Sequence, residues 1–341
     1  MSSCSIEVRP EGGKSVFVGG TTMRGSLVLR ATSACTVRGV DLRLRWETSG
    51  RGNTVRGKTD EVRVGEPFEL QEGDERVFRF ELPLPESPIS YSGKLFAVQW
   101  VLSAEVDVAM GLNPDIDMPF ELIAAERAGE GVLGPSFNRE ALQRAQRVST
   151  GSRMIWSIVA GIIFAAVFIL VGALSPNWDH PSSEDILYGA GFFLLALVGF
   201  VLIAGGAIQS RMRGQMQASL RNPLLRRGET LQASVTFTPR RAVRVEYATV
   251  RLELREHTRR QAGKSTHVHK HPVYADEHRI RVGEELPAGV PRELFAQMTV
   301  PPDQPQSICV RDNELEWRAT VRLEFSSGRP IEMEYPIAVL P

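Results

Sequence analysis

Val37-Arg-Gly-Val-Asp-Leu-Arg-Leu-Arg-Trp46 is the stretch that decides the fold class. Its apolar residues Val40, Leu42, Leu44 and Trp46 alternate with Asp and Arg. Successive side chains of a β-strand point to opposite faces, so this period of two predicts a strand that is buried on one face.

Similar alternation recurs on both sides of an apolar middle region. The runs are 26–30, 76–82 and 97–108 in the first arm, and 250–255 and 315–323 in the second. Clusters of Gly, Asn, Asp and Ser separate them, as turns require. Many short strands at this spacing predict an antiparallel β-sandwich in each arm, and therefore a mainly β protein.

The two arms also resemble each other. Three segments match in the same order: 20–29 with 228–237, 37–44 with 245–252, and 78–83 with 296–301. Further on, Trp100 matches Trp317. The series predicts one sandwich that has been duplicated; the alternative is coincidence between alternating strands.

Two charge-free apolar runs, 154–174 and 186–208, lie between the arms. A bilayer core of about 30 Å needs about 20 helical residues, and both runs reach that length. They predict a transmembrane hairpin with an external loop at 175–185. The alternative is a pair of helices buried in protein. Small residues in the runs would allow tight pairing within the hairpin or homo-oligomers through it.

Basic residues flank the hairpin, and the loop has none. The flanking arginines include Arg139, Arg144, Arg147, Arg153, Arg211 and Arg213. The positive-inside rule then predicts a two-pass integral protein of the plasma or inner membrane, with both termini cytoplasmic. These arginines are also candidates for contact with the membrane surface and its lipids, unless they only set the topology.

The predicted organisation follows from these patterns. It is an N-terminal β-sandwich (1–125), a partly helical juxtamembrane linker (126–153), transmembrane helix 1 (154–174), an external loop (175–185), transmembrane helix 2 (186–208), a basic linker (209–227) and a C-terminal β-sandwich (228–341).

Composition excludes several functions. The chain of 341 residues has 40 basic and 40 acidic side chains, which gives no overall attraction to nucleic acid. Its 3 cysteines have neither disulfide nor zinc spacing, which predicts free, buried thiols. No GxSxG, P-loop or GxGxxG motif occurs, so we expect no catalytic residues, no cofactor and no enzyme. An active site assembled between the arms would leave no such motif.

A histidine cluster is the sharpest candidate for chemistry. His267, His269 and His271 alternate, with His257 and His278 nearby. On a strand the three imidazoles would share a face, and neutral imidazole binds Zn, Cu or Ni. They would span about 13 Å at 3.3 Å per residue, so one ion would need a bent strand. The alternative is a solvated, basic hairpin.

Pro88-Ile-Ser-Tyr-Ser-Gly93, followed by Val98-Gln-Trp-Val-Leu-Ser-Ala-Glu-Val-Asp107, resembles the arrestin-like family. The resemblance implies two β-sandwich halves and an adaptor without catalysis, which binds cytosolic tails of membrane proteins or trafficking components. The apolar hairpin replaces the family's short linker, and no phosphate-sensing polar core can be mapped. A pair of immunoglobulin-like sandwiches is the alternative.

Together these observations predict a non-catalytic scaffold, tethered to the membrane, that binds an unknown protein partner at the cytosolic face. Its strand edges and loops would make the contacts. A metal-binding or metal-sensing membrane protein that uses the histidine cluster is the second hypothesis.

Overall fold

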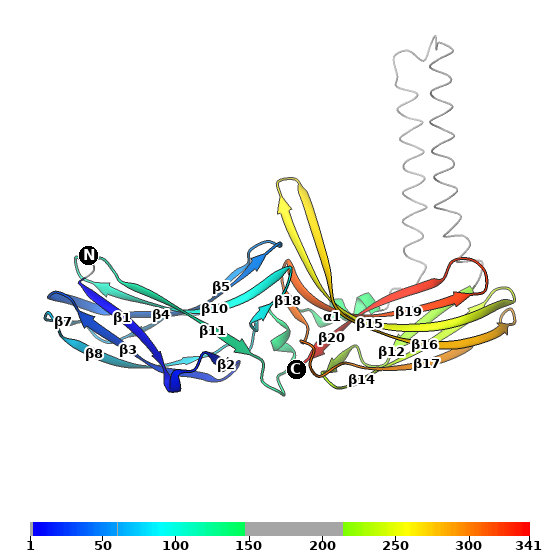
Figure 1. The fold of residues 1–341 in the computed structure, drawn as a ribbon, viewed down its shortest axis with the longest axis horizontal. Helices are drawn as coiled ribbons and strands as arrows, with labels where there is room; N and C mark the ends of the chain where they lie inside the picture. The colour runs from blue at the N-terminus through cyan, green and yellow to red at the C-terminus, as the bar shows by residue number, and fades with distance from the viewer. Residues whose placement is uncertain (1–2, 60, 147–213) are drawn as a thin grey trace, which may run out of the picture.

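The computed structural model describes residues 3–59, 61–146 and 214–341. In these residues the chain forms two sheet-rich halves that lie end to end (Figure 1). The prediction of a mainly β protein with two sandwich halves is therefore confirmed.

The first half places a three-stranded sheet, β1-β3-β8, against a larger sheet in the order β2-β11-β10-β4. The short strands β5, β6 and β7 pair with β4, and β9 pairs with β10. The strands are β1 (Cys4–Pro10), β2 (Val16–Val18), β3 (Thr22–Ala31), β4 (Cys35–Gly50), β5 (Arg56–Lys58), β6 (Val62–Val64), β7 (Phe68–Leu70), β8 (Glu75–Pro83), β9 (Tyr91–Ser92), β10 (Phe96–Val108) and β11 (Asp115–Ile123).

The second half repeats this plan, with β12-β14-β17 facing a sheet in the order β13-β20-β19-β15-β16. Its strands are β12 (Gly214–Leu220), β13 (Leu224–Arg226), β14 (Thr230–Pro239), β15 (Val243–Ala262), β16 (Ser265–Leu286), β17 (Arg292–Thr299), β18 (Ile308–Val310), β19 (Asn313–Phe325) and β20 (Ile331–Leu340). The short helices are η1 (Glu11–Gly13), η2 (Glu130–Leu133) and α1 (Arg139–Gln146).

The alternation seen in the sequence sets the burial of the long strands. Val40, Leu42 and Leu44 on β4 are buried, and the intervening Arg43 pairs with Glu61 on the solvent face. The amphipathic strand thus turns its apolar side chains to the sandwich core and leaves its charges in water.

The duplication extends to individual contacts. Trp100 and Trp317 each stand fifth in a 13-residue strand, β10 and β19, and both are buried. The indole N–H of Trp100 donates to Pro88 O at 2.7 Å, and that of Trp317 to Pro305 O at 3.0 Å. Such agreement in register and bonding makes coincidence a poor explanation of the sequence match.

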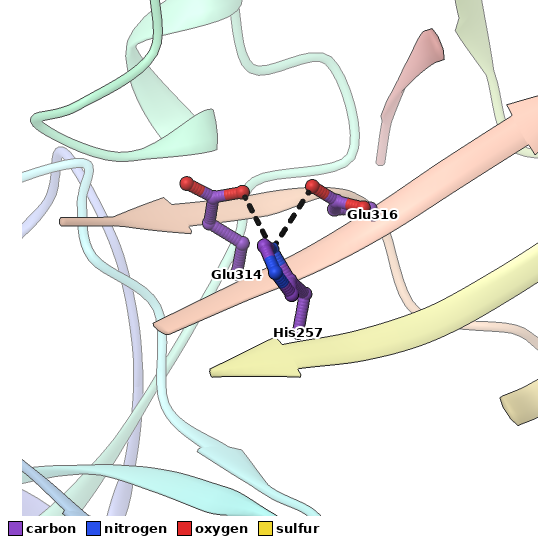
Figure 2. A group of neighbouring side chains, drawn as sticks. All are labelled: His257, Glu314 and Glu316. Carbon is purple, nitrogen blue, oxygen red and sulfur yellow. Dashed lines mark ion pairs between the residues drawn. The ribbon is translucent and has the colours of Figure 1, made fainter. Parts of the chain in front are cut away.

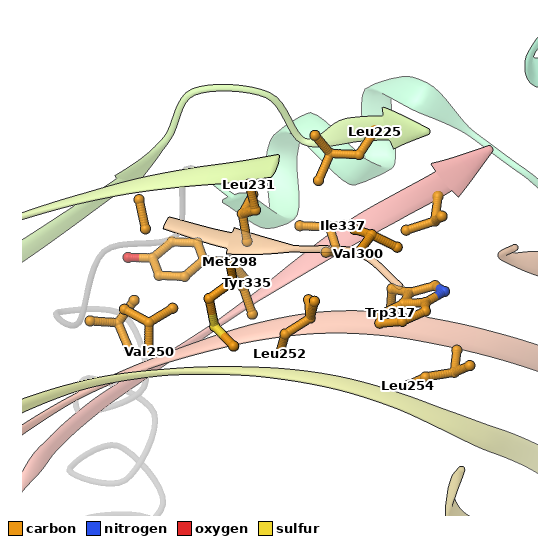
Figure 3. Close-up of a cluster of buried hydrophobic side chains, with 14 of the residues drawn as sticks. Leu225, Leu231, Val250, Leu252, Leu254, Met298, Val300, Trp317, Tyr335 and Ile337 are labelled. Atoms are coloured by element: carbon orange, nitrogen blue, oxygen red, sulfur yellow. The ribbon is translucent and has the colours of Figure 1, made fainter. Parts of the chain in front are cut away.

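The core of the second half reaches across the junction. Around Trp317 it includes Leu252 and Leu254 of β15 (Figure 3), and it continues into Phe96 and Val98 of the first half. A shared apolar core means that the two halves are joined by packing as well as by chain connectivity.

The prediction of a two-pass integral membrane protein is corrected. Within residues 3–59, 61–146 and 214–341, no helix is both long enough and apolar enough to cross a membrane. Helix α1 has 8 residues, which at 1.5 Å each gives about 12 Å against a hydrocarbon core of about 30 Å. The predicted spans 154–174 and 186–208 and their loop lie outside the described residues. An apolar run of spanning length does not by itself distinguish a spanning helix from a buried one. The membrane location and the cytoplasmic topology are therefore not carried further.

The predicted linkers contain secondary structure. Helix α1 lies within 126–153, where a helical part was expected. Strands β12 and β13 lie within 209–227 and pair with β14 and β20, so they belong to the second sandwich. In β12 the polar Gln215 and Gln217 occupy exposed positions on either side of the buried Met216, which is the same alternation over a short run.

Candidate functional site at the junction of the two halves

The junction forms where the ends of two strand pairs meet. β4 with β10, and β15 with β19, are the long antiparallel pairs of the two halves. In the register Thr48 lies opposite Val98, and Glu256 lies opposite Leu315. Both Thr48 and Glu256 are buried polar residues at matching positions of the duplicated fold. A buried polar group must find hydrogen-bond partners. Glu256 finds its donors in the first half, whereas Thr48 Oγ1 bonds to Asn53 and Val55 of its own half and accepts one further bond from Asn313 of the second half.

Glu256 on β15 has an exposed fraction of 0%. Its Oε1 accepts a hydrogen bond from the Tyr91 hydroxyl at 3.0 Å, and its Oε2 accepts one from the Leu95 backbone N–H at 2.9 Å. Both donors belong to the first half. Hydrogen bonds to a carboxylate are stronger than neutral ones, so Glu256 fastens the second half to the turn before β10.

The Tyr91–Gly93 turn is shaped for this carboxylate. A Cβ atom on Gly93 would overlap Glu256 Oε1, so only glycine lets the backbone of this turn approach the carboxylate. Burial, and after it the Glu256 charge, raises the pKa of Tyr91, which keeps the phenol protonated as a donor. The segment that carries the arrestin-like resemblance therefore also donates the hydrogen bonds to the other half.

A second connection is made by Asn313, the first residue of β19. Its Nδ2 donates to Thr48 Oγ1 at 3.1 Å and to Asn53 O at 2.8 Å. In return, Asn53 Nδ2 donates to Asp312 Oδ2 at 2.8 Å. A Cβ on Gly52 would overlap Asn313 Oδ1, so a second glycine permits close approach at this junction.

The loop after β4 also pairs with the end of β15. The Asn53 N–H donates to Arg259 O at 2.9 Å, and the Gln261 N–H donates to Asn53 Oδ1 at 3.1 Å. The first half therefore supports one side of the β15–β16 hairpin near its tip. In Figure 1 this hairpin rises between the two halves.

Three metal-ligating side chains gather on the outer face of the same sheet. His257 on β15 is directly opposite Glu314 on β19, and Glu316 is the next residue on that face (Figure 2). His257 Nδ1 lies 3.6 Å from Glu314 Oε2 and 3.4 Å from Glu316 Oε1. In the part of the chain that the structure describes, these three form the one set of His, Cys, Asp and Glu ligand atoms that all lie within 4.8 Å of one another.

Two arginines hold the far oxygen of Glu316. Arg318 Nη2 lies 2.9 Å and Arg255 Nε 3.4 Å from Glu316 Oε2. Burial would raise the pKa of Glu316, but hydrogen bonding with His257 and Glu314 and then the charge of Arg318 lower it well below its usual range, so it stays ionised. Hydrogen bonding to Glu314 and then to Glu316 raises the pKa of His257, against the effect of its burial.

Cys309 on β18 borders this group, directly opposite Glu314 in the register. Burial, followed by the charges of Glu314 and Glu316, raises its pKa to about 12. The reactive form of cysteine is the thiolate, which this environment disfavours near neutral pH. Cys309, like Cys4 and Cys35, forms no disulfide.

The predicted histidine cluster lies on β16, on the exposed side of the hairpin. His267, His269 and His271 are opposite Arg260, Thr258 and Glu256 in the register with β15. His267 is exposed, and the other two are partly exposed. Nothing tests their metal binding, which stays a prediction; the set whose atoms lie close together is the one around His257.

The arginines predicted to contact lipid are only partly described. Arg139 pairs with Glu130 at 2.8 Å, and Arg144 Nε donates to Glu140 O at 3.3 Å. Arg147, Arg153, Arg211 and Arg213 lie outside the described residues. A lipid role for the group is therefore untested, and the membrane location on which it rested has been corrected above.

Sequence reasoning missed the junction residues. Glu256 and Asn313 look like ordinary polar positions of alternating strands, and only their partners 165 and 265 residues away reveal them. One signal was available: Glu256-His257-Thr258 places three polar residues in a row where alternation predicts an apolar one. Such a break in the alternation indicates that this end of the strand contacts something other than the apolar core of its own sandwich.

Comparison with known proteins gives a partial match to a family model and a weak likeness to a solved structure. A family model described as Spo0M, SpoOM protein, matches residues 13–133, most of the first half. The solved structure of the sporulation control protein Spo0M from Bacillus subtilis aligns with 98% of this chain and 91% of its own, at 10% identity and a TM-score of 0.33. A score this low carries no inference about function. The sequence matches no curated protein. The first half is therefore similar to the Spo0M family, and the two sheet-rich halves expected from the arrestin-like resemblance are present.

Proposed function

We propose that this protein is a non-catalytic regulator that binds a protein partner through the β15–β16 hairpin. The partner would supply an acidic, extended segment that pairs with the outer edge of β16. The adaptor role expected from the arrestin-like resemblance and the partial match to the Spo0M family support a regulatory function. Control of sporulation is the role of the solved structure, and the proposal does not include it.

The observation that carries the proposal is the free edge of β16. This strand has 22 residues and ends the strand order of its sheet, with pairing to β15 on one side. Among the described residues, no strand pairs with its other side. An open edge presents a row of unpaired N–H and C=O groups, which an extended peptide can satisfy by adding a strand.

The chemistry of the edge indicates the partner. The hairpin tip carries exposed cations on both strands and in the turn between them: Arg259, Arg260, Lys264 and Lys270. Val268 and Val273 add exposed apolar surface on β16, with exposed fractions of 49% and 39%. A strand with alternating acidic and apolar side chains would match both features.

The first half contacts the β15–β16 hairpin, so a partner bound to the hairpin would affect the contact between the two halves. The Asn53 loop holds the inner side of β15 beside Arg259 and Gln261. A strand added to β16 would stiffen the hairpin, and through Asn53 and Asn313 it would affect the junction. The proposed role is therefore to couple partner binding to the contact between the halves.

Two observations favour binding over catalysis. Both oxygens of Glu256, the buried carboxylate at the junction, already accept hydrogen bonds from Tyr91 and Leu95. Depressions of about 110 Å³ and 90 Å³ lie at matching places on the outer faces of the two halves, lined largely by charged side chains. Small-molecule sites are commonly about 300–1,000 Å³ and mostly apolar.

The test uses a photo-crosslinking amino acid placed at Val268 on β16, and in a matched control at Val62 on β6, an exposed valine of the first half. A partner should crosslink from position 268 and not from position 62. A synthetic peptide of the crosslinked segment should then bind the full chain, as measured by fluorescence anisotropy.

Reversing two charges with Lys264→Glu and Lys270→Glu should weaken that peptide by about 10-fold or more, equivalent to about 1.4 kcal/mol. The proposal fails if both positions crosslink the same partner equally, or if charge reversal leaves the affinity unchanged.

A further inference from the structure

We propose that His257, Glu314 and Glu316 form a binding site for a divalent transition-metal ion, with Zn²⁺ as the best-matched ion. The site is separate from the predicted cluster at His267–His271. It does not depend on the proposed protein partner.

The geometry fits a tetrahedral ion. Zinc bound about 2.1 Å from nitrogen and oxygen ligands places those ligands about 3.4 Å apart. The separations from His257 Nδ1 are 3.4 Å to Glu316 Oε1 and 3.6 Å to Glu314 Oε2. Both nitrogen–oxygen separations therefore lie within a few tenths of an ångström of the tetrahedral spacing, and the two carboxylate oxygens lie within 4.8 Å of each other.

The ligand types agree with the geometry. One imidazole and two carboxylates form a mixed N/O set that zinc accepts, with a fourth position left for water or for an incoming side chain. The position of the His257 side chain is restricted, because only 7% of its surface is exposed and its strand is paired on both sides.

The groups around the ligands act as an outer shell. Arg255 and Arg318 both engage Glu316 Oε2, which directs Oε1 toward His257. Hydrogen bonds to the free oxygen of a carboxylate ligand are a regular part of metal sites, since they fix its orientation. Lys270, opposite His257 on β16, is exposed to solvent.

The duplicated fold shows that these side chains are not needed to build the strand pair. By their place in the strands, His257, Glu314 and Glu316 correspond to Ser49, Ala97 and Gln99. Ser49 and Ala97 are register partners in the first half, as His257 and Glu314 are in the second. The first half forms the same pairing without ligating residues, so the sandwich does not require them.

The site is placed to influence the junction. His257 follows Glu256, and Glu314 follows Asn313, and these preceding residues hold the first half. An ion that joins β15 to β19 at this point would fix the two strand ends from which both connections arise.

The experiment is a Zn²⁺ titration of the chelator-treated full chain, measured by competition with a chromophoric chelator. It is made on a background of His267→Ala, His269→Ala and His271→Ala, which removes the exposed cluster. One ion per chain should bind. Glu314→Gln, at a partly exposed position, should weaken binding by about 100-fold, and Arg318→Gln by about 10-fold. Near-UV circular dichroism checks that each variant is folded.

X-ray absorption of the zinc-loaded background protein should show nitrogen and oxygen ligands that include one imidazole. The proposal is overturned by the absence of binding on that background, by unchanged affinity in Glu314→Gln, or by a sulfur ligand, which would implicate Cys309.

Discussion

The two halves of this protein follow one sandwich plan and differ most along one edge. Matching strands have equal lengths in several places: β1 and β12 have 7 residues, β3 and β14 have 10, and β10 and β19 have 13. The difference lies beside the long strand. Three short strands, β5, β6 and β7, cover β4, whereas one continuous strand, β16, runs along β15.

This comparison separates what builds the fold from what was added to it. The shared parts supply the buried core and its tryptophans. The unshared parts, the long hairpin and the polar group at His257, both belong to the second half and both reach the junction. Features that a duplicate can lose while keeping its fold are the better candidates for function.

The equivalence of the two tryptophans gives the largest expected effect. Trp100→Ala and Trp317→Ala should each lower the free energy of unfolding by about 3–5 kcal/mol, because each removes a fully buried side chain and leaves a cavity. Urea denaturation of the full chain measures both. If one substitution lowers the free energy of unfolding by less than about 1 kcal/mol, the two tryptophans do not stabilise their halves equally, although their positions in the strands match.

The junction should show the next largest effect. Glu256→Ala removes the acceptor of the Tyr91 hydroxyl and the Leu95 N–H, and should cost about 3 kcal/mol, since a buried and a half-buried donor lose their partner. Uncoupling should also separate the unfolding of the two halves into two transitions in urea. Thr48→Ala, at the matching position of β4, is the comparison and should cost less because its hydroxyl is neutral. A single unshifted transition for Glu256→Ala would contradict the assigned role.

The glycine that admits Glu256 should be intolerant of a side chain. Gly93→Ala should cost about 1–2 kcal/mol, because the new methyl group overlaps the carboxylate and the junction must shift. Gly129→Ala is a matched control, since a Cβ there meets no atom within 4 Å. Thermal unfolding compares the two, and equal melting temperatures would show that the close approach at Gly93 is unimportant.

Substitutions along the edge that differs between the halves, β16 in the second half and β6 in the first, should have the smallest effect on stability. Val268→Thr on β16 and Val62→Thr on β6 should each change the free energy of unfolding by less than about 0.5 kcal/mol, because both side chains are exposed. The two variants should nevertheless differ in partner binding, with a loss only at β16. A large loss of stability in Val268→Thr would mean that the hairpin is structural.

Much of the architecture was accessible from the sequence because the signal was local. Val40, Leu42 and Leu44 alternate along one strand, and the match of Trp100 to Trp317 indicated the duplication. The apolar runs were equally clear in the sequence, but the membrane location inferred from them did not hold. Length and hydropathy describe a segment, while location depends on what surrounds it.

By itself, then, the sequence determined the strand periodicity and the two sheet-rich halves, since each is encoded in short runs of neighbouring residues. Only the tertiary structure decided what the polar residues do. It brought Glu256 to Tyr91 and Asn313 to Thr48, and it aligned His257 with Glu314 across two strands. The physical reason is that the free energy of a buried polar group depends on its partner, and distance along the chain carries no information about that partner.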